Sequence, residues 1–202
     1  MIIYGRRMSR TGRCLWTLEE LGLPYRQVPI DTQQGENRTA EFLALNPSGK
    51  VPVLDHDGFV MRESMAINTY LVLQGDTPLW PFGVQIRARI HQWSSWAATE
   101  LDPPLSTIVH ERRRAATAGG EPNAALLADC LTMAAKALTL LEDHLQSHDY
   151  LVGDGFSLAD INACSMVMLT PMFLDLAAYP STQQWVGRCT ARAAWQRVET
   201  LP

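Results

Sequence analysis

The side chains best suited to chemistry stand where short apolar strands give way to helices. Glu63 and Ser64 precede a helical pattern that runs through Ile67 and Leu71. We expect Ser64 to be the N-cap of this helix, so that its hydroxyl and the free N–H groups of the first turn form an anion site. Glu63 beside it can bind an ammonium group. The pair therefore suits a small ligand that carries both charges.

A proline-containing strand comes shortly before that helix. The turn formers of Asn46-Pro47-Ser48-Gly49 are followed by Lys50-Val51-Pro52-Val53-Leu54. Because proline donates no backbone hydrogen bond, we expect Pro52 at the start or edge of its strand. The backbone groups of Val51 can then hold an extended peptide by strand addition, and a cis Val51–Pro52 bond would turn them outward. The sequence leaves open whether that bond is cis.

A second group of candidates lies where the first strand meets the first helix. Ser9 and Thr11 both carry hydroxyls in this segment. A hydroxyl hydrogen bond together with the positive end of a helix stabilises a thiolate. Ser9 is the candidate catalytic residue, and Thr11 and Arg13 are candidates for supporting the thiolate. The alternative is that Ser9 is only the N-cap of the first helix.

Composition excludes several function classes. With 202 residues, 47% of them hydrophobic, the chain can bury a sizeable core. A net charge of −4 argues against a nucleic-acid-binding surface, which needs clustered Lys and Arg. Apolar runs are too short for a signal peptide or for the roughly 18 residues of a membrane span. We therefore expect a cytoplasmic protein with no nucleic-acid or membrane partner.

The cysteines and histidines predict neither a disulfide framework nor a metal site. No two cysteines form a C-x-x-C pair, and Cys14 near the first helix has no partner thiol. His144 and His148 have i,i+4 spacing, but no third ligand accompanies them. Packing at a helix end is the favoured interpretation of these two histidines.

The pattern of apolar residues divides the chain into two parts. Residues 1–75 alternate short strands with helices, which predicts an α/β domain with a mixed sheet. Turn formers at 74–81 predict a linker, and the helical spacing of residues 83–202 predicts an all-α domain. The expected strands are 2–4, 25–28, 53–54 and 59–61, and the expected helices of the first part are 10–21, 39–45 and the one after Glu63.

Two further features belong to the helical part. Residues 115–122 are predicted to form a loop between helices. Ser157 and Asp160 have the spacing of a capping box, and Phe156 can pack on Ile161 as a hydrophobic staple. We assign Ser157 and Asp160 to folding, not to chemistry.

The proline segment 46–54 and the Glu63-Ser64-Met65-Ala66-Ile67 segment together resemble the glutathione site of the cytosolic glutathione transferases. Gly5-Arg6-Arg7-Met8-Ser9, followed by Arg13-Cys14, is similar to the plant-type serine class, with one residue fewer between the serine and the Arg-Cys pair. This resemblance implies a thioredoxin-like glutathione-binding domain at 1–75. It also implies a helical-bundle domain at 83–202 that contributes the pocket for an electrophile.

The resemblance also implies functional assignments. Ser9 would activate the thiol of glutathione, the cosubstrate, for attack on a small apolar electrophile, and the protein would be a homodimer. Lys50 and Arg38 are candidates for the glycine carboxylate of glutathione, with Asn37 as a further donor. The full set of expected glutathione-binding residues is Asn37, Arg38, Lys50, Val51, Pro52, Glu63 and Ser64.

Two alternatives to a transferase remain open. One is a different glutathione-dependent reaction, namely isomerisation, dehalogenation or ether cleavage. The other is a transferase-like interaction protein without catalysis, because one fold hosts many functions. The intact Val51-Pro52 and Glu63-Ser64 pairs argue against the second alternative.

Overall fold

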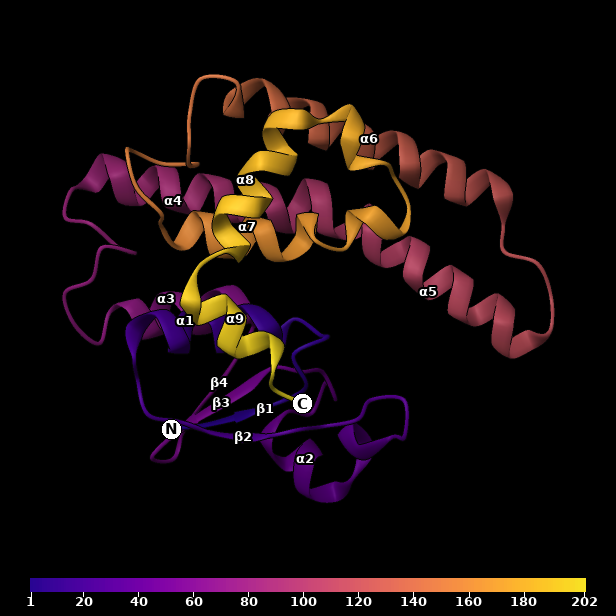
Figure 1. The fold of residues 1–202 in the computed structure, drawn as a ribbon. Coiled ribbons are helices and arrows are strands. Elements are labelled where there is room, and N and C mark those ends of the chain that lie inside the picture. The colour runs from indigo at the N-terminus through magenta and orange to yellow at the C-terminus, as the bar shows by residue number, and fades with distance from the viewer. The chain divides into compact units, whose positions relative to one another are not determined.

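The computed structural model describes all 202 residues of the chain (Figure 1). Its contacts divide the chain into two compact units. The first contains Met1–Pro81 together with Thr190–Pro202, and the second contains Phe82–Cys189. The sequence placed residues 190–202 in the helical domain at 83–202. In the structure this C-terminal segment groups with the N-terminal residues instead.

The first unit is built on a four-stranded mixed sheet in the order β2-β1-β3-β4. β1 pairs in parallel with β2, whereas the β1–β3 and β3–β4 pairs are antiparallel. The predicted mixed sheet and thioredoxin-like arrangement are confirmed. The strands are β1 (Ile2–Tyr4), β2 (Arg26–Val28), β3 (Val53–His56) and β4 (Phe59–Arg62).

Helices cover both faces of this sheet, with α1 and α3 on one face and α2 on the other (Figure 1). α1 ends because Gly22 adopts the left-handed conformation, with φ 62°. The last helix, α9, packs along α1, and the Trp16 and Trp195 ring centroids lie 4.7 Å apart. The helices are α1 (Thr11–Leu21), α2 (Ala40–Leu45), α3 (Ser64–Val72), α9 (Ala193–Glu199) and the 3-10 turn η1 (Glu36–Arg38).

The second unit is helical, as predicted. A π-helical stretch, Ala97–Leu101, separates its first two long helices. The prediction of a loop from 115 is wrong, because alanine favours helix and α5 continues until Gly119 at φ 65°. The elements are α4 (Val84–Trp96), α5 (Asp102–Ala118), α6 (Ala124–Leu145), α7 (Leu158–Val167) and α8 (Pro180–Thr190), with 3-10 turns at Thr170–Met172 and Leu176–Ala178.

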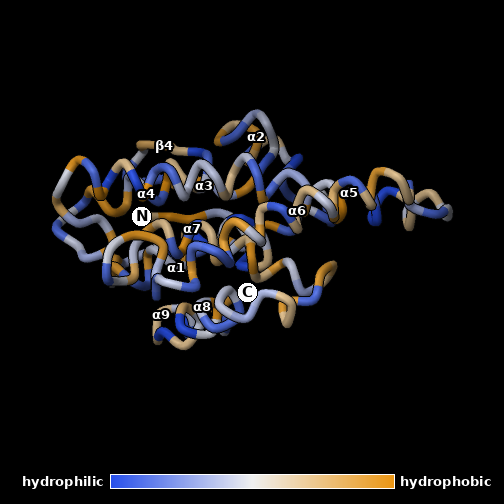
Figure 2. The backbone as a smooth tube through the Cα atoms, turned by 90° about the horizontal axis from the view of Figure 1, so that it is seen from above, coloured by the Kyte–Doolittle hydropathy of each residue, from blue (hydrophilic) through white to orange (hydrophobic).

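α6 is a core helix. The expectation that no apolar run is long enough for a membrane span is wrong for α6, because its length and apolar composition alone would allow it to cross a membrane. Ala134, Leu138, Leu141 and Leu145 are buried, whereas Lys136 and its neighbours on the other side are exposed. In Figure 2, apolar and polar residues alternate along α4 and α5, as expected for helices with one buried face.

Two buried carboxylates organise the helix starts of this unit. Asp160 accepts hydrogen bonds from the N–H of Ser157 at 2.8 Å and from its hydroxyl at 2.9 Å, so the predicted capping box is present. Glu142 of α6 accepts from the N–H groups of Ser181 and Thr182 at 2.9 and 2.8 Å. Glu142 therefore satisfies the free N–H groups at the start of α8.

Candidate glutathione site

Ser9 lies exposed in the loop between β1 and α1. Its Oγ is 2.7 Å from the carbonyl oxygen of Arg6 and 2.9 Å from Thr11 Oγ1. The N–H of Thr11 donates to Ser9 Oγ at 3.1 Å. Since a serine hydroxyl carries one proton, it can donate to only one acceptor at a time. A ligand sulfur can therefore compete for that proton, while the N–H of Thr11 still holds the oxygen.

The start of α1 places positive partial charge beside Ser9. The N–H of Gly12 donates to the carbonyl of Ser9 at 3.0 Å, and α1 begins at Thr11. Ser9 thus satisfies two N–H groups of the first turn and still presents its hydroxyl to solvent. Arg13, which the sequence named as a candidate for supporting the thiolate, is buried in the same turn. The alternative that Ser9 is the N-cap of the first helix is wrong by one residue, because Arg10 is the N-cap and Ser9 lies one position before it.

Two glycines allow this loop to fold tightly. A Cβ on Gly12 would lie 2.4 Å from the backbone oxygen of Arg7. A Cβ on Gly5 would lie 2.0 Å from Thr11 Oγ1 and 3.1 Å from the Cβ of Val51. Only glycine fits at either position, and the second contact places the start of this loop beside Val51.

Cys14 is unsuited to supply a thiolate itself. It is fully buried, and burial raises the pKa of its thiol to about 12, although the nearby Arg13 acts to lower it. Its Sγ donates to the carbonyl of Ser64 at 3.5 Å. Cys14 therefore serves to join α1 to α3.

The Val51–Pro52 peptide bond is cis. Pro52 is buried and precedes β3, whereas Val51 is half-buried. No protein group forms a hydrogen bond with the N–H or the C=O of Val51. These two backbone groups are therefore unpaired within the protein, and their use by a peptide laid alongside stays a prediction.

Asn46 shapes the turn before Val51. Its Nδ2 donates to the carbonyl of Lys50 at 2.6 Å. Its Oδ1 accepts from the N–H of Ser48 at 3.1 Å and from the hydroxyl at 2.8 Å. The sequence motif identified the turn, but not this role of its first residue.

Asn37 and Arg38 pack against the same turn. Asn37 is buried, and its Nδ2 donates to the carbonyl of Gly49 at 2.6 Å. A Cβ on Gly49, which has φ 63°, would lie 2.6 Å from Arg38 Nη1. The exposed Arg38 guanidinium thus lies over Gly49 and forms no ion pair within the protein. Lys50, also exposed and without an ion pair, follows in the chain.

The expectation that Ser64 is the N-cap of α3 is wrong by one residue. Glu63 is the N-cap, with φ 67°, and its carbonyl accepts the first intrahelical bond from Ile67 at 2.9 Å. This left-handed conformation turns the chain sharply out of β4, so that Ser64 becomes the first helical residue. The Ser64 hydroxyl and the Glu63 carboxylate form no hydrogen bond with the protein. Both polar groups are therefore available at the start of α3.

The geometry brings Ser9, Thr11, Val51 and Ser64 to one end of the sheet. β1 and β3 are paired with Tyr4 opposite Val53, and the Cys14–Ser64 bond joins the two helices. Arg38 and Lys50 lie by the turn at 46–49 and have no contact with Ser9. Sequence reasoning missed Arg7 and Gln27, which hold the Ser9 loop through residues far away in sequence.

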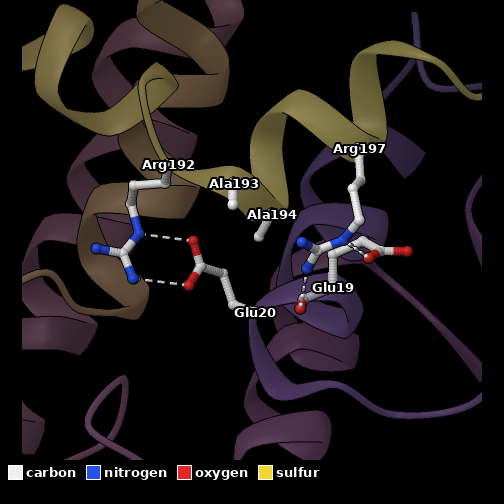
Figure 3. Close-up of a pocket in the computed structure, with 6 residues that line it drawn as sticks. All are labelled: Glu19, Glu20, Arg192, Ala193, Ala194 and Arg197. Atoms are coloured by element: carbon white, nitrogen blue, oxygen red, sulfur yellow. Dashed lines mark hydrogen bonds and ion pairs between the residues drawn. The ribbon is translucent and has the colours of Figure 1, made fainter.

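A separate pocket of about 330 Å³ lies between α1 and the C-terminal segment (Figure 3). Glu20 pairs with Arg192 at 2.6 Å and Glu19 with Arg197 at 2.6 Å. These charges are paired with one another, and the two ion pairs hold α9 against α1. No group of three or more His, Cys, Asp or Glu side chains that could hold a metal ion is present.

Comparisons with known proteins agree on one family. Residues 1–72 match the model of the glutathione S-transferase N-terminal domain, and residues 96–193 match that of the C-terminal domain. Glutathione S-transferase 3 of Zea mays is 33% identical over 209 residues, covering 99% of this chain and 94% of that protein. Glutathione S-transferase GstB of Escherichia coli strain K12 is 33% identical over 205 residues, covering 99% and 98%.

A solved structure of similar fold is glutathione S-transferase-I bound with lactoylglutathione. It matches with a TM-score of 0.84 and 29% identity over 98% of this chain and 97% of that one. The match thus extends over both domains and nearly the whole chain. This chain belongs to the cytosolic glutathione S-transferase family.

Proposed function

We propose that this transferase binds glutathione along Val51 and activates its thiol with the hydroxyl of Ser9. The observation that carries the proposal is the position of Ser9, exposed at the start of α1 and held by the N–H of Thr11 at 3.1 Å. A hydrogen bond from Ser9 and the positive end of α1 would both favour the thiolate. The thiolate then attacks an apolar electrophile.

The unpaired polar groups support a specific orientation of the tripeptide. The N–H and C=O of Val51 would pair with the glutathione backbone next to the buried Pro52. Ser64 and the first N–H groups of α3 would bind the γ-glutamyl carboxylate, and Glu63 the ammonium group.

The glycine carboxylate at the other end of the tripeptide needs a cation. Lys50 and Arg38 are the proposed partners, because both are exposed and neither forms an ion pair in the protein. Asn37 is assigned a positioning role, since its amide already donates to the carbonyl of Gly49 at 2.6 Å. It would hold the turn that presents the two cations.

A change in hydrogen bonding would accompany activation. When Ser9 donates its proton to sulfur, it no longer donates to the carbonyl of Arg6 or to Thr11. The Thr11 hydroxyl, 2.9 Å away, can then donate to Ser9 Oγ together with the Thr11 N–H. Donation into the oxygen would strengthen the bond from Ser9 to the sulfur. Thr11 and the buried Arg13 are thus proposed to support the thiolate.

The proposed roles of the two domains, the location and the oligomeric state depend on the resemblance to the family. Residues 1–75 would form the glutathione-binding domain, and residues 83–202 would contribute the electrophile pocket. We further propose a cytoplasmic homodimer, because two-fold association is the commonest arrangement of soluble oligomers. A chain of 22.5 kDa would then elute at about twice its mass.

The test combines calorimetry with a conjugation assay that uses a model electrophile. Ser9→Ala is expected to lower turnover by about 10²–10³-fold, the scale of one lost donor to a developing anion, with much less effect on glutathione affinity. Thr132→Ala removes an exposed hydroxyl from α6 and serves as the matched control. Turnover that is unchanged in Ser9→Ala would refute the assignment.

A further inference from the structure

The loop that carries Ser9 is fixed at its first residues by β2 and the segment after it. The N–H of Gly5 donates to the carbonyl of Val28 at 2.9 Å, and Gln27 Nε2 donates to the carbonyl of Gly5 at 2.8 Å. Arg6 Nη1 lies 2.9 Å from the Asp31 carboxylate. These contacts hold the entry into the loop but do not reach Ser9.

The next part of the loop is held by residues almost 200 positions away in sequence. Arg7 Nε donates to the carbonyl of Leu201 at 2.9 Å, across a separation of 194 residues. The N–H of Arg7 donates to the carbonyl of Pro202 at 3.1 Å. Gln27 Nε2 also lies 3.2 Å from the Pro202 oxygen. The C-terminal strap, defined as residues 198–202, therefore lies against Arg7.

One peptide unit links the strap to Ser9. The Arg6 carbonyl and the Arg7 N–H belong to the same planar peptide group. The carbonyl accepts from Ser9 Oγ at 2.7 Å and from the Ser9 N–H at 3.1 Å, while the N–H donates to Pro202. A rotation of this peptide would break the contacts on both sides. When the hydroxyl turns to a ligand sulfur, the bond from the Ser9 N–H to the Arg6 carbonyl remains, so the position of Ser9 still depends on the peptide group that the strap holds.

The segment that leads into the strap is anchored to α1, the helix that begins beside Ser9. Arg192 bonds both carboxylate oxygens of Glu20 at 2.6 and 2.8 Å (Figure 3). Arg197 bonds the Glu19 carboxylate at 2.6 Å and its carbonyl at 3.0 Å. Val198, the first residue of the strap, is fully buried. The C-terminal segment is therefore attached both to α1 and to the loop that precedes it.

We propose that Arg7 is a positioning residue that uses the C-terminal strap to orient the Ser9 hydroxyl toward the glutathione sulfur. The inference rests on the proposed function of Ser9. It separates thiol activation from glutathione binding, because Arg7 forms no hydrogen bond with Val51, Glu63 or Ser64. Loss of the Arg7 anchor should affect the ionisation of the bound thiol and kcat, and should leave the affinity for glutathione largely intact.

The experiment compares Arg7→Met with Arg7→Lys in the full chain. Arg7→Met removes the donor to Leu201, whereas Arg7→Lys keeps a charged donor and should recover part of the effect. We expect Arg7→Met to lower kcat on the order of ten- to hundredfold, as for a misplaced catalytic group, with KM for glutathione within about threefold of the parent value. The pH at which the bound thiol ionises should rise. Arg26→Met, which removes an exposed arginine from β2, is the matched control.

Gln27→Leu provides an independent second variant, since it removes the side-chain donor to both Gly5 and Pro202. Hydrogen exchange should show faster exchange at residues 6–12 in Gln27→Leu and in Arg7→Met than in Arg26→Met. An Arg7→Met enzyme with the parent kcat and thiol ionisation would overturn the inference. If Ser9→Ala also left thiol ionisation unchanged, the proposed function itself would fail, so the two failures are distinguishable.

Discussion

The thiol of Cys14 donates a hydrogen bond to the carbonyl of Ser64 at 3.5 Å, which joins the starts of α1 and α3. One of these helices begins beside Ser9 and the other presents Ser64. Their separation therefore sets the distance between the proposed thiol-activating end and the anion-binding end of the site. A buried residue that takes no part in the chemistry thus fixes the geometry of both.

Cys14→Ala should lower the stability of the protein without removing thiol activation. Loss of the hydrogen bond is expected to reduce the free energy of unfolding by about 0.5–1.5 kcal/mol, measured by urea denaturation. Because burial raises the Cys14 pKa to about 12, the folded protein should resist thiol-labelling reagents near neutral pH. Rapid labelling of Cys14 in the folded state would contradict this structural role.

Ser64→Ala should weaken glutathione binding by about 1–3 kcal/mol, because it removes a proposed hydrogen bond to a carboxylate at a buried helix start. Calorimetry measures this directly, with Thr132→Ala on α6 as the control for loss of a hydroxyl. The turnover of saturated Ser64→Ala enzyme should change much less than its affinity. If Ser64→Ala binds glutathione as tightly as the parent protein, the γ-glutamyl carboxylate must bind elsewhere.

Gly49→Ala should disturb the turn that carries the proposed glycine-carboxylate partners. A left-handed alanine costs about 1–2 kcal/mol. At Gly49 the new Cβ would also lie 2.6 Å from Arg38 Nη1 and 3.1 Å from the Asn37 oxygen. Gly35→Ala is the matched control, because Gly35 has φ 76° and no atom within 4 Å of the added Cβ.

Thermal unfolding and glutathione titration should therefore separate these two glycine variants. Both lose stability through the backbone conformation, but only Gly49→Ala should also lose affinity for glutathione. Equal affinities would mean that the turn at Gly49 has no part in binding.

Glu142 should make the stability of the helical unit depend on acid pH. Burial raises the pKa of its carboxyl, but hydrogen bonds from Thr182 and Ser181 outweigh this and lower it below the usual 4.5. A carboxyl with a lowered folded-state pKa contributes stability above its unfolded pKa and loses it as the pH falls through the folded value. The melting temperature should therefore decline below about pH 5.

Glu142→Gln should melt lower than the parent protein at neutral pH and show a smaller decline in acid, measured by calorimetry across pH. Asp143→Asn changes an exposed carboxylate on the same helix and provides the control. A parent-like decline in Glu142→Gln would assign the acid dependence to other carboxyls.

Local patterns in the sequence predicted several elements of both units. The strand beginning at Ile2, the helix ending before Gly22 and the Ser157–Asp160 capping box all depend on residues close together in the chain. Such features are encoded by periodicity, turn formers and caps. The family resemblance then supplied the type of each domain and their order along the chain.

Features that depend on distant contacts or on backbone conformation could not be read in the same way. The ion pair between Arg192 and Glu20 attaches α9 to α1, and no local sequence pattern predicts such a pair. Glu63 adopts a positive φ and takes the N-cap position expected for Ser64. The sequence did not reveal this, because a positive φ is uncommon for a non-glycine residue. The sequence also did not show that the amide of Asn37 is bound within the protein, since its partner Gly49 lies in a separate turn.

The most direct test of the account is an ultraviolet titration of the glutathione thiol bound to the parent enzyme and to Ser9→Ala, Thr11→Ala and Cys14→Ala. If Ser9 activates the thiol, the thiol should ionise at clearly higher pH in Ser9→Ala, at intermediate pH in Thr11→Ala and at the parent pH in Cys14→Ala. Ionisation at the parent pH in Ser9→Ala, with a shift in Thr11→Ala or Cys14→Ala instead, would contradict this role of Ser9.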